Sequence, residues 1–297
     1  MILALLRTGE VGWGGVAVVL RAAYYTGSLG GAGLAFFALL FGTRREVDPR
    51  RLGRWAAGAA LLGIAAGLGV LTAQVAELTG GEALGDREAW DVVLGSRAGA
   101  SYGLGGIGLL LVAALALGSR WAAVAATGGV VACASYALLG HTTELAPRPL
   151  LAALLLVHLV VAAYWIGSLP PLAWAARRDG PGAARLVEDW ARIAAGAVPV
   201  LVAAGLLLAW WILGGIGELL GSWYGWALLT KLSLVAVLLG FAAWHRFRLT
   251  PALASRAPEG GVRLARSVTA EAVVALLVLW AAAEMVSTSP GGMPGVR

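Results

Sequence analysis

The chain has 297 residues, of which 60% are hydrophobic and 13% are charged, and its formal net charge is +6. A soluble domain carries about 25% charged residues, so this composition excludes an ordinary soluble protein and indicates an integral membrane protein in contact with lipid. The basic excess is better explained by arginines that set membrane topology than by a phosphate-binding surface, and no nucleic-acid partner is expected. The N-terminal sequence MILALLRTGE lacks the pattern of a signal peptide.

Eight apolar runs are long enough to span a bilayer, which takes about 20 residues each. They lie near residues 20–42, 54–76, 98–118, 121–140, 149–174, 190–214, 224–244 and 267–286. They predict an all-α, polytopic membrane bundle of about eight transmembrane helices, in one membrane domain that covers residues 1–297. Residues 1–19 form an interfacial or re-entrant segment, or an extension of the first helix.

The arginines between the runs predict the orientation of the bundle. Segments 43–54, 118–121, 175–192 and 244–267 hold 15 arginines, whereas the opposite side holds six. By the positive-inside tendency, both termini lie outside. The longest external segment, residues 77–98, is acidic, and we expect a lid, a cation-attracting mouth or a plain solvated loop there.

Glycine pairs with a small-xxx-small spacing predict close contacts between helices. These pairs are Gly27/Gly31, Gly63/Gly67 and Gly99/Gly103.

Two of the three histidines fall in the outer half of the predicted bundle. His141 closes the fourth run, and His158 lies about nine residues into the fifth. An imidazole inside a bilayer is costly without a partner, so it is a functional hypothesis by default. His158 either hydrogen-bonds to another helix or binds an ion.

Soft sulfur ligands near this level favour copper over other metals. Imidazole suits several transition metals, whereas a thioether or thiolate selects Cu(I). We therefore predict a metal site formed by His141, His158 and Met285. Met293 and Cys133 are further candidate ligands, although Cys133 also fits a small core residue.

Other polar residues are expected to support this site. We expect Lys231 to pair with Glu284, because an unpaired charge at that depth is unfavourable. Trp165 shares a helix face with His158 and would wall the site. His245 is followed by two arginines and is expected at a solvated basic helix end.

The sequence lacks HExxH, CxxC, P-loop and GxSxG motifs. Hydrolytic zinc chemistry and ATP use therefore have no residue support, and we do not expect an enzyme.

Several segments together resemble the copper resistance protein D (CopD) family of membrane proteins. The similar segments are GHTTE, HLVVAAYWIGSLPPL, VEDWARIAAGAVPVLVAAGLLLAWW and SWYGWALLTKLSLVAVLLGFAAWHRFRLTPAL. The resemblance covers residues 140–290 well and the first half only as a helix pattern. At His245 the family usually has Asn before Arg, which is a departure from its pattern.

The resemblance implies a copper-handling protein of the bacterial inner membrane that takes up copper from the outer side. The positions that match the family motif are His141, His158, Tyr224, Gly225 and Lys231, so Tyr224 is a further residue near the site. A periplasmic copper-binding protein is an expected partner.

Two alternatives stay open from the residues. One is a haem b-binding membrane redox protein, because neutral imidazole also serves as an axial haem ligand. The other is a docking scaffold for a periplasmic copper protein, with the acidic segment 77–98 as the docking surface.

Overall fold

The computed structural model describes residues 13–81, 84–139, 145–178, 181–213, 216–221, 223–250 and 259–287, and every regular element there is helical. The elements are α2 (Trp13–Phe41), α3 (Pro49–Leu78), α4 (Arg87–Gly95), α5 (Arg97–Ala113), η1 (Ala114–Leu117), η2 (Ser119–Trp121), α6 (Ala122–Ser135), η3 (Tyr136–Leu138), α7 (Arg148–Arg177), α8 (Pro181–Leu213), α9 (Ile216–Gly221), α10 (Trp223–Trp244), η5 (His245–Leu249) and α12 (Gly260–Ser287).

Within the described residues, eight stretches are long and apolar enough to cross a membrane, which confirms the predicted polytopic bundle. They are Gly15–Phe41, Pro49–Leu78, Arg97–Leu117, Ser119–Leu138, Arg148–Arg177, Gly182–Leu213, Gly225–Leu249 and Gly260–Val286. The orientation of the termini stays a prediction.

Several helices begin earlier than the apolar runs, because local capping sets the start of a helix. In α3, the Asp48 carboxylate accepts hydrogen bonds from the backbone N–H groups of Arg50 (3.0 Å) and Arg51 (3.3 Å), and Pro49 takes the first helical position. An Asp cap and a proline at this position both favour a helix start. The helix therefore runs through its arginines before it reaches the apolar run.

The segment predicted as an acidic external loop contains the nine-residue helix α4. The Asp86 carboxylate caps it by accepting from the backbone N–H groups of Glu88 (2.9 Å) and Ala89 (3.4 Å). The Trp90 indole N–H donates to the Leu84 carbonyl at 2.8 Å. Asp86 is thus engaged as a helix cap, which sequence spacing alone did not predict. Glu82, one of the acidic residues of this segment, lies outside the described residues.

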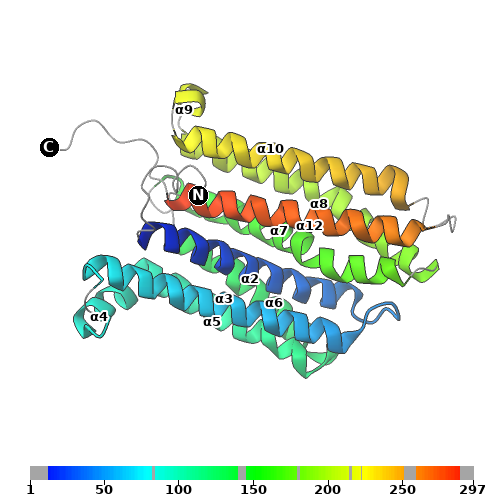
Figure 1. Cartoon of the computed structure of the whole chain (residues 1–297), viewed down its shortest axis with the longest axis horizontal. Coiled ribbons are helices and arrows are strands. Elements are labelled where there is room, and N and C mark those ends of the chain that lie inside the picture. Colours follow the sequence, from blue (N-terminus) through cyan, green and yellow to red (C-terminus); the bar gives the residue numbers. More distant parts are fainter. Residues whose placement is uncertain are drawn as a thin grey trace.

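Helix α2 lies at the centre of the bundle (Figure 1). It packs against α3, α5, α6, α7 and α12. It begins at Trp13, so residues 13–19 belong to the first helix, one of the alternatives that the sequence left open. The ends of the bundle differ: α4 and α9 lie at one end, here called the acidic-loop end, and most arginines lie at the other, the arginine-rich end (Figure 1).

Glycines allow α2 to meet two neighbours at backbone distance. A Cβ atom at Gly27 would overlap the backbone of Gly63 on α3, which agrees with the predicted close contacts. A tighter crossing joins α2 to α7, because a Cβ at Gly33 would overlap the Ala163 carbonyl and a Cβ at Gly167 would lie 2.5 Å from Gly33. Gly103, in contrast, has open space around it, so its predicted contact is not formed within the bundle.

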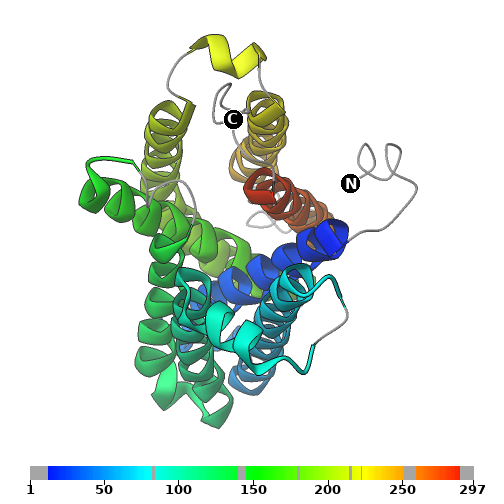
Figure 2. The same cartoon turned by 90° about the vertical axis from the view of Figure 1, so that its left-hand side faces the viewer.

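The fifth, sixth and seventh spans pack less densely than the first four. Helix α8 packs chiefly on α7, and α10 packs on α12. Figure 2 shows α9 lying across the gap between the ends of α8 and α10. Large apolar side chains are exposed along both helices, including Leu206, Trp210 and Val237. This is the surface expected of helices that face lipid.

Candidate functional site

His158 is held between α7 and α8. Its Nδ1 lies 3.1 Å from the Leu201 carbonyl oxygen on α8. A carbonyl can only accept, so Nδ1 carries the proton and the lone pair of Nε2 is free to bind an ion. Metal-ligating histidines characteristically donate their other ring N–H to a carbonyl or carboxylate. The structure therefore presents His158 in a tautomer that can bind a metal ion through Nε2.

Gly205 makes the contact between α8 and the imidazole. A Cβ at Gly205 would lie 2.9 Å from His158 Cε1 and 3.1 Å from Nδ1. The absence of a side chain therefore lets the α8 backbone lie directly against the ring. This contact was not predictable from the sequence, because nothing in the sequence pairs Gly205 with a histidine 47 residues earlier.

Lys231 lies on α10, near enough to His158 for its charge to act on the imidazole. The ion pair of Lys231 with Glu284 stays a prediction. Glu284 accepts a hydrogen bond at 2.9 Å from the indole N–H of Trp280, one turn earlier on α12. Local i,i+4 geometry on α12 therefore engages this carboxylate.

Met285 is buried in a small apolar cluster between α8, α9, α10 and α12. Its neighbours there are Leu228, Ala209, Ile212, Leu213, Leu219 and Ala227. On α8, this cluster begins four residues beyond Gly205, which is about 6 Å along the helix axis toward the acidic-loop end. Met285 thus lies in the same half of the bundle as His158 but nearer its end.

The remaining predicted ligands lie elsewhere or outside the described residues. Cys133 is a free, buried thiol on α6, near Tyr24 and Tyr136 in the first half of the chain. His141, Met293 and the Tyr224 side chain lie outside what the structure describes. Their roles stay predictions.

Trp165 and His245 belong to a second polar cluster, toward the arginine-rich end. The Trp165 indole N–H donates to Glu271 Oε1 at 2.6 Å, and His245 Nδ1 lies 3.2 Å from Glu271 Oε2. His245 is only 8% exposed, so the prediction of a solvated helix end is wrong. The sequence feature that could have predicted this cluster is Glu271, because a lone carboxylate in an apolar run needs a partner.

Two family models match the chain. The model described as "Copper resistance protein D-like, N-terminal domain" matches residues 11–147, and the model "Copper resistance protein D" matches residues 184–285. The first match extends the likeness over the first four spans, where the sequence resembles the family only as a helix pattern. Neither the curated proteins nor the solved structures gave a match. The chain belongs to the copper resistance protein D family, and it is a multi-pass membrane protein of a family linked to copper resistance.

Proposed function

We propose that this protein takes up copper ions at the acidic-loop end of the bundle and carries them into the membrane, with His158 as an ion ligand. The observation that carries this proposal is the hydrogen bond between His158 Nδ1 and the Leu201 carbonyl, because it leaves Nε2 free at a depth of about 15 Å along α7. Copper is the cargo in this proposal, as the family match supports.

Met285 precedes His158 on this path. An ion that enters from the acidic-loop end meets the level of Met285 first and the imidazole about 6 Å deeper. Thioether and imidazole both suit Cu(I). His141 and Met293 would complete the ligand set at the mouth of the path.

Lys231 limits how long the ion stays at His158. An ammonium group has no lone pair while protonated, and its charge opposes a cation on the neighbouring imidazole. A conducting site needs binding that is weak enough for the ion to leave. The lysine is therefore a repulsive neighbour that favours onward release.

The donor of the ion would be a copper-binding protein outside the membrane, in the bacterial periplasm if the protein lies in the inner membrane. Glu88 and Asp91 on α4 are exposed and would attract a cation or a basic docking surface. This transfer exchanges the ligands of the copper ion and makes no covalent product, so the proposed role is that of a transporter.

The test is copper uptake into proteoliposomes, combined with a metal and chromophore inventory of the purified protein. His158→Ala is expected to lower uptake about tenfold or more, since it removes the free lone pair. Val157→Ala is the control, because Val157 is the neighbouring residue, is 41% exposed and carries no ligand atom.

Unchanged uptake in His158→Ala would exclude His158 as a ligand. A strong Soret absorption band in the purified wild type, lost in His158→Ala, would instead establish the haem b alternative, because haem ligation uses the same tautomer.

Gly205→Ala tests the orientation of the imidazole without removing it. The added Cβ displaces the ring and breaks its bond to the Leu201 carbonyl, so copper binding is expected to weaken about tenfold. Thermal stability should change little, because a side chain can move aside and alanine favours a helix. Gly196→Ala on the same helix is the control, since open space surrounds Gly196. Equal copper affinity in the two variants would contradict the role given to Gly205.

A further inference from the structure

His245 and Glu271 form a buried pair in the part of the bundle that the proposed copper path does not use. In the described chain, Glu271 is the only buried acidic side chain, with 1% exposure. It lies 11 residues into α12, about 16 Å from the start of that helix. A carboxylate there is strongly unfavourable unless it has a cationic or hydrogen-bonding partner.

Contacts to Trp165 and to Ser267, on either side of the pair, orient the Glu271 and His245 side chains. Glu271 accepts from Trp165 through Oε1, and its Oε2 faces His245 Nδ1 at 3.2 Å. The other ring nitrogen, His245 Nε2, lies 2.8 Å from the Ser267 hydroxyl. His245 begins the π-helical turn η5, a backbone irregularity that recurs at functional sites.

A cavity of about 30 Å³ lies beside the buried pair. Three buried polar atoms belong to residues that line it. Trp190 Nε1 and Thr250 Oγ1 have no hydrogen-bond partner among the described residues, and Glu271 Oε2 makes the ion pair with His245 Nδ1 but accepts no hydrogen bond there. Together they offer an acceptor, a donor and a hydroxyl that can act as either. A buried water needs two to four such partners and about this much space. The cavity is therefore shaped and lined for water.

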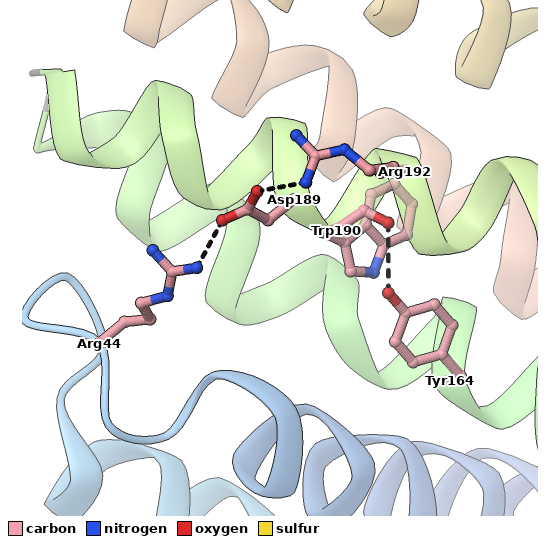
Figure 3. Close-up of polar contacts among 5 residues, drawn as sticks. All are labelled: Arg44, Tyr164, Asp189, Trp190 and Arg192. Carbon is pink, nitrogen blue, oxygen red and sulfur yellow. Dashed lines mark hydrogen bonds and ion pairs between the residues drawn. The ribbon is translucent and has the colours of Figure 1, made fainter.

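The ligand atoms suit water and a proton rather than a metal ion. Among the described residues, no group of three or more His, Cys, Asp or Glu side chains is placed to hold a metal. The Trp190 indole N–H can only donate, so it would direct its hydrogen at a cation in the cavity. Its position is set by α7 and α8, since the Tyr164 hydroxyl donates to the Trp190 carbonyl at 3.3 Å (Figure 3).

Few other charges face the buried pair. Arg246 lines the cavity but its side chain is exposed, and the nearest charged residue on α12 is the exposed Arg266. On α8, Asp189 is held in ion pairs with Arg44 and Arg192 (Figure 3). The charged residues of α2 and α10 lie toward the other end of the bundle, and those of α7 lie at its two ends.

We propose that His245 and Glu271, with water in the cavity beside them, form a proton-binding site that exchanges with the arginine-rich side and releases its proton when a cation enters from His158. The pair is neutral when it holds one proton, whether on the imidazole or on the carboxyl group. Loss of this proton leaves one negative charge in the membrane interior, which is unfavourable unless a cation arrives to balance it.

The two sites lie along one face of α7. His158 and Trp165 are seven residues apart, nearly two turns, so they lie on the same face about 10 Å apart. Trp165 donates directly to Glu271. Arg246, whose side chain is exposed, lines the cavity, so the cavity lies near the surface of the arginine-rich end. The coupling to a cation rests on the proposed function, whereas the proton site itself does not.

The coupling is tested by adding copper(I) to the purified full-length protein in weakly buffered detergent solution, and measuring bound copper and released protons together. Wild type is expected to release about one proton for each copper bound. Glu271→Gln keeps the shape of the side chain but lacks the proton, so it should bind copper with little or no proton release. Glu188→Gln, which changes an exposed carboxylate on α8, is the matched control and should release protons as wild type does. Equal release from Glu271→Gln and wild type would overturn the coupling.

A second measurement keeps the proton site separate from the copper hypothesis. Infrared difference spectra between two pH values should show a carboxyl signal that is absent in Glu271→Gln and present in Glu188→Gln. If wild type binds no copper, the proposed function fails, and this signal alone decides the proton site. If no such signal belongs to Glu271, the proton site is overturned. Should Glu271→Gln fail to fold, His245→Asn serves instead, because loss of the imidazole must alter the same signal.

Discussion

Replacement of Gly33 by valine is expected to lower the free energy of unfolding by about 3 kcal/mol or more, the upper range for an overpacked interior. At this position the α2 backbone meets the Ala163 carbonyl and Gly167 on α7, so a side chain has no space to occupy. The obstacle is backbone on both sides, and neither helix can yield by a change of rotamer. Separation of α2 from α7 would open the centre of the bundle.

The measurement is the thermal midpoint of the detergent-solubilised protein, followed by size-exclusion chromatography. Gly30→Val is the matched control, because Gly30 lies one turn earlier on the same helix and has open space around it. This variant removes a glycine from the helix at no steric cost. If both variants melt at the same temperature, α2 and α7 do not cross at Gly33.

The second large effect is expected for His245→Leu. It leaves Glu271 buried without its imidazole partner, and removal of one member of a buried pair costs about 3–5 kcal/mol. Addition of Glu271→Leu should restore part of the lost stability, since the unpaired carboxylate is then gone. The two substitutions should therefore be far from additive in the thermal midpoint. Additive losses would falsify a direct interaction between the two side chains.

The number and approximate location of the membrane spans were predictable from the sequence, because about 20 apolar residues are a property of one continuous segment. Helix ends were less predictable. The start of α3 depends on the Asp48 cap and on Pro49, which extend the helix beyond its apolar run.

The contacts of the site were less accessible to sequence reasoning. His158 was identified as unusual from its depth alone, but its partners Leu201 and Gly205 come from α8, and no spacing rule relates two helices. For the same reason the crossing of Gly33 with Gly167 was missed. Lys231 and Glu284 were predicted to pair because their charges are opposite and their depths in the bundle are similar. The hydrogen bond that Glu284 accepts comes from Trp280 of its own helix, α12.

The uneven packing of the spans has a mechanical consequence. In the most apolar part of each span, 67% of the residues of α2 are buried within the protein, against 6% in the span that contains α10. A helix with few buried contacts is the least costly one to displace, because local stability follows contact density. A displacement of α10 would therefore cost less than one of α2 or α7, which cross at backbone distance. Since α10 carries Lys231 and continues into His245, one displacement of α10 would change the surroundings of both polar sites at once.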